Sequence, residues 1–238
     1  MLQTDQLTIG YSGKVIARDL TAILPARTLT ALVGSNGCGK STLLRTIAGL
    51  LPPLSGTVSP EANARNTALV LTDRIDAAGL RVADVVALGR IPHTGLTGRM
   101  TDDDVAATQR AMTLCDILHL QHCRMSEISD GERQRTMIAR AIAQDTPIIL
   151  LDEPTAFLDF PSKVSTLKLL RRLAHDEGRT ILLSSHDLEI TFQLADRLWL
   201  LSTSGLREGT PEELAHNGAL ARLFPLLQFD TINLRFNL

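Results

Sequence analysis

The segment that constrains this chain most is a glycine-rich loop at residues 34–41, which reads Gly-Ser-Asn-Gly-Cys-Gly-Lys-Ser. It matches the G-x-x-x-x-G-K-S/T pattern of phosphate-binding loops in full. An apolar, β-branched run at residues 28–33 leads into the loop, and Leu43, Leu44 and Ile47 follow it at helical spacing. We therefore expect a buried strand, the loop and a helix in succession, so that backbone N–H groups and the helix N-terminus converge on one anion.

The residue types in this loop suit a nucleoside triphosphate. Lys40 is long enough to reach the β- and γ-phosphates, and the Ser41 hydroxyl is a suitable ligand for Mg²⁺. Cys38 is expected to be a small filler without a redox role. An ordinary glycine-rich turn is the alternative, which the flanking strand and helix patterns disfavour. The nucleotide-binding residues expected here are Gly34, Ser35, Asn36, Gly37, Cys38, Gly39, Lys40, Ser41 and Thr42.

A second strand pattern ends in two acidic residues. Residues 148–151 read Ile-Ile-Leu-Leu, and Asp152 and Glu153 follow them directly. Asp152 is suited to hold Mg²⁺, directly or through water, and Glu153 to orient a water molecule or accept its proton. The alternative is an acidic turn that is merely solvated, and the complete phosphate-binding loop disfavours it.

Strand-like and helix-like patterns alternate along most of the chain. This alternation predicts an α/β fold of the P-loop NTPase type with a mainly parallel sheet. Residues 2–11 and 20–24, with a turn at Ser12-Gly13, are expected to add an antiparallel β portion at the N-terminus. Residues from about 76 to 146 are expected to form a helical subdomain inserted in a single domain that spans residues 1–238.

Capping residues indicate where helices begin. Thr101, Ser129 and Thr210 each have an acidic residue three positions later, as in a capping box. The helix after Thr210 is expected to be the last one, and residues 198–208 are expected to form a hairpin around Gly205. The pattern predicts no element for the C-terminal residues beyond that helix.

Composition excludes several classes of protein. Hydrophobic residues make up 44% of the 238 residues, which is ample for a core. The net charge of −2 gives no reason to expect nucleic acid as a partner. Three cysteines in a chain of this length argue against a disulfide framework and for a reducing compartment. Residues 1–10 lack a secretory signal pattern, and no stretch approaches the roughly 18 to 20 apolar residues that cross a bilayer. Any membrane part is therefore expected on another chain.

Residues 128–135 distinguish among proteins that carry a phosphate-binding loop. They read Ile-Ser-Asp-Gly-Glu-Arg-Gln-Arg and resemble the signature motif of the ABC ATPase family, usually written Leu-Ser-Gly-Gly-Gln. The resemblance implies that Ser129, Gly131 and Glu132 contact the γ-phosphate of ATP held by a second copy of the chain. The alternative is a capped helix start with no ligand. Asp130 replaces a glycine of the motif and is expected to point away and cap the helix.

The resemblance to ABC ATPases extends over nearly the whole chain. It implies that Tyr11 stacks on adenine and that Asp159 borders the dimer interface. It also implies that His186 bonds the γ-phosphate and holds Glu153 and water in line. A tyrosine that packs in the hairpin and a structural histidine at a strand end are the alternatives. The implied catalytic residues are Glu153, His186 and Lys40.

The resemblance also implies a Mg²⁺ site, with one departure from the family pattern. Thr72 stands where the family has its Q-loop glutamine, and Asp73 is a second candidate to replace that metal contact. The implied Mg²⁺ ligands are Ser41, Asp152 and Thr72.

One stretch points to a particular branch of that family. Residues 81–93 end in Gly-Arg-Ile-Pro-His, and with Gly98-Arg99 and residues 102–104 they resemble the ATPases that import iron-siderophores, haem and cobalamin. The resemblance implies a homodimer docked on integral membrane permease subunits near residues 72–95. It further implies indirect contact with a periplasmic or surface substrate-binding protein, and a peripheral location on the cytoplasmic face of the inner (plasma) membrane. A plain amphipathic helix is the alternative for this stretch.

Two other functions stay open from the sequence. One is a soluble ABC ATPase without a permease, acting in cofactor assembly or another non-transport role. The other is a nucleotide-binding regulator with little turnover, which the Thr72 departure allows. The sequence does not identify the transported substrate, because the ATPase subunit does not touch it.

A local group of potential metal ligands also needs an interpretation. Cys115, His119, His122 and Cys123 lie close together in the sequence. Their spacing matches no standard zinc pattern, and leucines surround them, so a packed helix end is favoured over a metal site.

Overall fold

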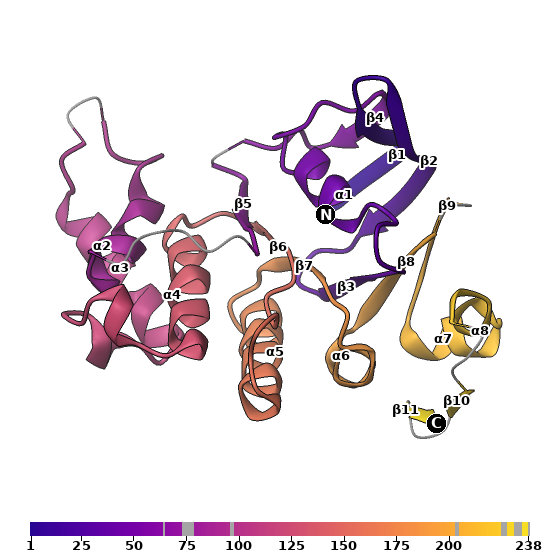
Figure 1. Ribbon diagram of the computed structural model, residues 1–238. Coiled ribbons are helices and arrows are strands. Elements are labelled where there is room, and N and C mark those ends of the chain that lie inside the picture. The colour runs from indigo at the N-terminus through magenta and orange to yellow at the C-terminus, as the bar shows by residue number, and fades with distance from the viewer. Residues whose placement is uncertain are drawn as a thin grey trace.

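The central sheet is built from strands that are far apart in the sequence. The computed structural model describes residues 1–63, 65–72, 79–95, 98–202, 205–224, 228–230 and 235–237. Within these residues, the strands of the central sheet follow the order β5-β6-β7-β3-β8-β9 (Figure 1). Their bounds are β3 Leu29–Val33, β5 Thr67–Val70, β6 Ile148–Leu151, β7 Thr180–Ser184, β8 Arg197–Ser202 and β9 Gly205–Gly209.

The parallel strands are buried on both faces, which explains their composition. Every residue of β3, β6 and β7 is buried, and these strands consist mainly of leucine, isoleucine, valine and alanine. Pairing is parallel from β5 to β8, whereas β9 runs antiparallel to β8. The predicted α/β fold with a mainly parallel sheet and the predicted hairpin around Gly205 are both confirmed.

A second sheet forms the antiparallel β portion expected at the N-terminus. Its order is β2-β1-β4, with β1 at Leu2–Tyr11, β2 at Lys14–Leu24 and β4 at Ser55–Ser59. Strand β2 is longer than predicted and begins at Lys14, because Lys14, Val15 and Ala17 also pair with β1. Helix α1, Lys40–Ile47, shares one hydrophobic cluster with this sheet.

The helices between β5 and β6 gather on one side of the central sheet (Figure 1). They are α2 Val82–Ala87, η1 Leu88–Arg90, α3 Asp102–Leu114, η2 Leu118–Leu120, η3 Met125–Glu127 and α4 Asp130–Ala143. Thr101 and Ser129 cap α3 and α4 as predicted, because each hydroxyl accepts an N–H bond from the residue three positions later. Helix α5, Phe160–His175, follows β6, and α6, Leu188–Leu194, follows β7.

The C-terminal part holds more structure than the sequence indicates. Helix α7, Pro211–His216, is capped by Thr210 as predicted. The expectation that α7 is the last helix is wrong, because Gly218, with a φ of 71°, starts α8 at Ala219–Leu223. Two further strands, β10 Gln228–Asp230 and β11 Arg235–Asn237, pair antiparallel.

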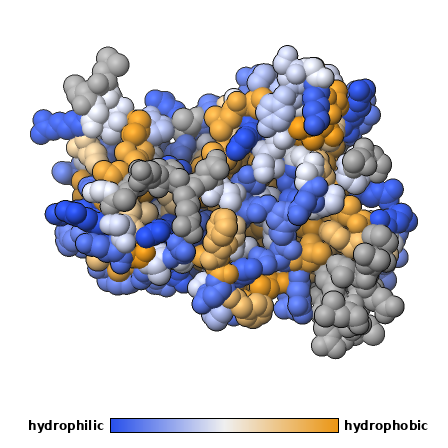
Figure 2. All heavy atoms as spheres, viewed as in Figure 1, coloured by the Kyte–Doolittle hydropathy of each residue, from blue (hydrophilic) through white to orange (hydrophobic). Residues whose placement is uncertain are grey.

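The face of the molecule seen in Figure 2 is mostly polar. In the view of Figure 2, hydrophilic residues cover most of the surface and apolar residues form separate patches. Among the described residues, none of the helices combines the length and hydropathy that crossing a membrane requires.

Candidate functional site

The glycine-rich loop between β3 and α1 depends on backbone conformations that only glycine adopts easily. Gly37 has a φ of 76°, and Gly39, the N-cap residue of α1, has a φ of 107°. A Cβ atom on Gly39 would lie 2.6 Å from the Ile16 Cγ2 atom, so the position also lacks room for a side chain. The Lys40 ammonium group donates to the carbonyls of Gly34 (3.0 Å) and Ser35 (3.2 Å) and therefore lies along the loop.

Cys38 is packed beneath this loop. Its side chain is buried in the cluster that α1 shares with the N-terminal sheet, and burial raises the pKa of its thiol. A thiol in this environment stays protonated and unreactive, which agrees with the expected role as a filler.

Oxygen ligands converge beside the loop. The Ser41 hydroxyl donates to Asp152 Oδ1 at 3.1 Å, and the Ser184 hydroxyl donates to the same oxygen at 2.7 Å. Thr72 lies next to them, because its hydroxyl donates to the backbone carbonyl of Asp152 at 2.7 Å. Hydroxyl and carboxylate oxygens are the ligands that Mg²⁺ prefers, so this donor set fits that ion. Asp73, the second candidate for the metal contact, lies outside the described residues.

Glu153 and His186 form the titratable pair of the site. The His186 Nε2 and Glu153 Oε1 atoms are 2.5 Å apart. Glu153 has a left-handed φ of 49°, and its N–H donates to the Ser184 hydroxyl at 2.9 Å. The turn after β6 is thus attached to the end of β7, which brings the two predicted residues together.

Ser184 is the residue of this site that sequence reasoning missed. It is fully buried, accepts a hydrogen bond from the Glu153 N–H and donates one to the Asp152 carboxylate. The signal that could have found it is a polar residue at the end of a buried strand that neighbours the acidic strand.

The predicted signature residues lie at the tip of α4. The Ser129 hydroxyl accepts a bond from the Glu132 N–H (3.3 Å) and donates to the Glu132 carboxylate (2.7 Å), which also accepts the Ser129 N–H (2.8 Å). These bonds to Ser129 lower the pKa of the Glu132 carboxyl group. Within one chain, α4 stands apart from α1 (Figure 1). One copy therefore does not bring these residues onto its own loop.

The expectation that Asp130 caps α4 is wrong. Ser129 takes the cap position with an extended backbone, and Asp130 is the first residue inside the helix. The Asp130 carboxylate instead forms an ion pair with Arg133 at 3.3 Å, one helical turn later.

Two further predicted residues lie at element ends. Tyr11 is the last residue of β1, and the residue is 45% exposed. Asp159 is the N-cap of α5, and its carboxylate accepts the Ser162 N–H at 3.0 Å. Hydrogen bonds from Ser162 lower the pKa of Asp159.

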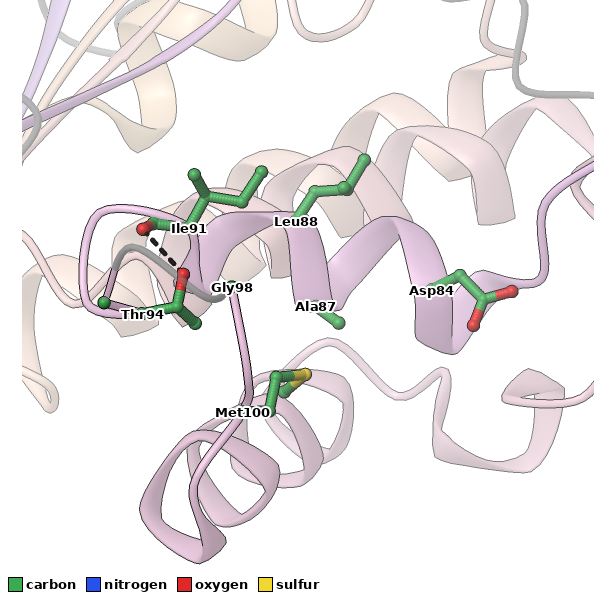
Figure 3. Close-up of a pocket in the computed structure, with 8 residues that line it drawn as sticks. Asp84, Ala87, Leu88, Ile91, Thr94, Gly98 and Met100 are labelled. Atoms are coloured by element: carbon green, nitrogen blue, oxygen red, sulfur yellow. Dashed lines mark hydrogen bonds between the residues drawn. The ribbon is translucent and has the colours of Figure 1, made fainter.

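A groove of about 420 Å³ runs along the stretch that carries the Gly-Arg-Ile-Pro-His sequence (Figure 3). Leu88 and Ile91, both largely exposed, lie on one side of it, and Met100 lies opposite. The residues that line it are Asp84, Ala87, Leu88, Ile91, Thr94, Gly95, Gly98 and Met100.

The same stretch is anchored to the C-terminal end of α4. A Cβ atom on Gly89 would lie 2.2 Å from the Arg140 carbonyl oxygen, so only glycine permits this close approach. The buried Arg90 donates to Asp104 Oδ1 (2.8 Å) and to the Ala143 carbonyl (2.7 Å). Hydrogen bonds from Thr101 and Arg90 lower the pKa of Asp104 to about 2.

Cys115, the first of the four cysteines and histidines at residues 115–123, is a packed core residue. Cys115 ends α3 in the hydrophobic core, and burial raises the pKa of its thiol to about 12. Within the described parts of the chain, no group of three or more histidine, cysteine or acidic residues could hold a metal ion.

The fold and the loop define a P-loop nucleotide-binding protein, and comparison with known proteins identifies its family. Residues 17–156 match the family model described as ABC transporter. The chain is 35% identical over 236 residues to the ferric enterobactin transport ATP-binding protein of Escherichia coli, covering 94% of this chain and 87% of that protein. It is 36% identical over 224 residues to a cobalamin import ATP-binding protein of Halobacterium salinarum, covering 90% of this chain and 56% of that protein.

Solved structures agree with this result. One chain of an ABC transporter in an inward-facing conformation superimposes with a TM-score of 0.86 at 28% identity, over 96% of this chain and 92% of that chain. A nucleotide-free ATP-binding cassette, 20% identical, matches in fold with a TM-score of 0.83, over 94% of this chain and 97% of that chain. This chain therefore belongs to the ABC transporter family as an ATP-binding subunit, and the predicted resemblance to the iron-chelate and cobalamin branch is confirmed.

Proposed function

We propose that this chain is the ATP-hydrolysing subunit of an importer for a metal chelate such as an iron-siderophore, haem or cobalamin. The observation that carries the proposal is the convergence of Ser41, at the start of α1, with Asp152, Glu153 and His186, which follow the neighbouring strands β6 and β7. Relatives named for import of ferric enterobactin and cobalamin support the class of cargo.

In this proposal each residue of the site has a separate role in nucleotide binding or hydrolysis. The loop amides and Lys40 bind the phosphates, Tyr11 stacks on adenine, and Glu153 orients the attacking water and accepts its proton. His186, 2.5 Å from Glu153, holds that carboxylate in line and donates a hydrogen bond to the γ-phosphate. Ser41, Asp152 and Thr72 would hold Mg²⁺, which neutralises phosphate charge when bound.

We further propose that the working unit is a homodimer. In one chain the tip of α4 lies away from the loop, so its Ser129, Gly131 and Glu132 serve the nucleotide of a second copy (Figure 1). Asp159, at the start of α5, borders the interface in this arrangement.

The groove in Figure 3 is the proposed docking site for permease helices. Residues from about 76 to 146 act as a helical subdomain that moves with the permease, on the cytoplasmic face of the inner membrane. Arg90 and Gly89 support this assignment, because they attach the groove to α4, whose other end carries Ser129. The periplasmic or surface binding protein contacts the permease and not this chain.

The test uses Glu153→Gln in the purified chain and in its membrane complex. We expect ATP binding to persist, turnover to fall by about 10²-fold or more, and ATP to trap a stable dimer. Glu177→Gln is the matched control, since Glu177 pairs with Arg110 beyond the far end of α5. Normal turnover by Glu153→Gln would remove Glu153 from its proposed role.

Transport is tested separately from hydrolysis. A tagged chain should co-purify with a polytopic membrane protein from detergent-solubilised membranes, and its deletion should abolish uptake of a radiolabelled chelate. Hydrolysis without such a partner, stimulated by a soluble scaffold, would favour the non-transport alternative.

A further inference from the structure

Asp187 makes bonds that its position does not predict. It follows His186 and stands at the N-cap of α6, where an aspartate usually accepts backbone N–H groups of its own helix. Its side chain makes no such cap. Its two carboxylate oxygens are used by other elements instead: Oδ2 accepts from the Thr155 hydroxyl and Oδ1 from the Lys163 ammonium group, each at 2.8 Å.

These two partners belong to segments on either side of Asp159. Thr155 is buried in the turn that begins with Glu153. Lys163 lies in the first turn of α5, and its N–H donates to the Asp159 carbonyl at 2.9 Å. The Asp187 carboxylate therefore joins the turn of Glu153, the start of α5 and the loop of His186 at one point.

The surroundings make this junction stiff. The side chains of Lys163 and Asp187 are only 25% and 27% exposed, so water and salt screen their attraction less than on an open surface. The Asp187 N–H donates to the Ser185 hydroxyl at 3.0 Å, and Thr191 bonds the same hydroxyl at 2.9 Å. Helices α5 and α6, which the junction connects, lie side by side below the sheet (Figure 1).

We propose that Asp187, held by Lys163 and Thr155, is a positioning residue that sets His186 against Glu153. The inference rests on the hydrolytic role proposed above and adds residues to it. A 2.5 Å contact between His186 and Glu153 tolerates little displacement, and the loop of His186 is fixed to the turn of Glu153 through this carboxylate. Because Lys163 lies one turn from Asp159, the same junction transmits a displacement at Asp159 to His186.

The first test is Lys163→Gln, which removes the charge and keeps most of the side chain. We expect kcat for ATP to fall about tenfold, while KM and the Kd of ATP stay within about twofold. Lys163→Arg, which keeps the ion pair, should restore at least half of wild-type kcat. Arg110→Gln is the matched control, because it breaks an ion pair with Glu177 outside the site and should leave kcat unchanged.

The second test separates positioning from a general structural role. If Lys163 acts through His186, adding Lys163→Gln to His186→Ala should lower kcat no further. A further tenfold loss in that background would overturn the proposal, and so would wild-type kcat in Lys163→Gln alone. A wild-type protein that never hydrolyses ATP would instead contradict the proposed function. Failure of the Asp187 proposal and failure of the proposed function therefore give different results.

Discussion

The tips of helices α1 and α4 are both assigned to the same phosphate in our proposal, yet they are built in opposite ways. At α1 the N-cap is Gly39, and no side chain caps the helix. At α4 the N-cap is Ser129, and Ser129 and Glu132 satisfy each other's backbone N–H groups. Free amides at a helix N-terminus attract an anion, whereas a closed capping box already occupies two of them.

This difference suggests an order of events. In our proposal ATP binds first at the loop before α1, because that loop is arranged for phosphate in the single chain. In the proposed dimer, the Ser129 hydroxyl exchanges its bond to the Glu132 carboxylate for one to the γ-phosphate held by the second copy. Closure of the proposed dimer would therefore cost free energy at α4, whereas nucleotide binding at α1 would not.

Among changes at the two helix tips, Lys40→Ala has the largest expected effect, because it acts on the tip that is arranged for phosphate. Charge-assisted bonds from Lys40 should contribute about 3 kcal/mol, so the Kd for ATP should rise about 100-fold. Titration of the single chain with a fluorescent ATP analogue measures this. Lys168→Ala, an exposed lysine on α5, is the control. A Kd within threefold of wild type would mean that the α1 tip is not the primary phosphate site.

Ser129→Ala tests the other tip and should change a different quantity. The Kd of ATP for the single chain should stay within twofold of wild type, while kcat falls about tenfold for loss of one hydrogen bond to the phosphate. Steady-state hydrolysis at saturating ATP measures kcat. The helix also loses its cap, at about 1 kcal/mol, so thermal unfolding must confirm that the variant is folded. A raised Kd with unchanged kcat would reverse the assignment of the two tips.

Helix caps are the features that the local sequence predicted best. Caps at Thr101, Ser129 and Thr210 were predictable, because each depends on residues three positions apart. The wrong expectation for Asp130 is a conflict between two adjacent capping residues, which backbone geometry decides in favour of Ser129.

Contacts between distant segments could not be predicted in this way. Ser184 meets Asp152, and Asp187 meets Thr155, only because the strands β6 and β7 pair in parallel and in register. The phosphate-binding loop could be predicted because it consists of consecutive residues. Two of its glycines adopt positive φ angles that other residues rarely adopt, so the pattern is visible in the sequence. The hairpin of β10 and β11 and the groove beside Leu88 leave no comparable pattern in the sequence.

Glu132→Gln should make the α4 tip a better site for an anion while leaving its cap in place. A glutamine keeps the capping box but removes a negative charge from the proposed position of the γ-phosphate. At about 4 Å in water, that repulsion is worth about 1 kcal/mol, so the ATP-driven dimer should tighten about fivefold. Sedimentation at several protein concentrations, in the Glu153→Gln background, measures it. Glu127→Gln, in the box at the start of η3, is the control. Weaker dimerisation would show that the Glu132 charge is needed at the interface.

The smallest expected effect is a dependence of stability on pH that comes from the same carboxylate. Bonds from Ser129 lower the pKa of Glu132 in the folded chain, so the unfolded chain binds its proton more readily. The stabilisation is therefore complete above the unfolded pKa, near 4.3, and is lost as pH falls through the lower folded pKa. An acidic residue in the first turn contributes about 0.5 kcal/mol, so wild type should exceed Glu132→Gln by that amount at pH 7 and match it at low pH. Urea unfolding of both proteins across this range measures the difference. A gap that stays constant with pH would mean that Ser129, and not the Glu132 charge, stabilises the tip of α4.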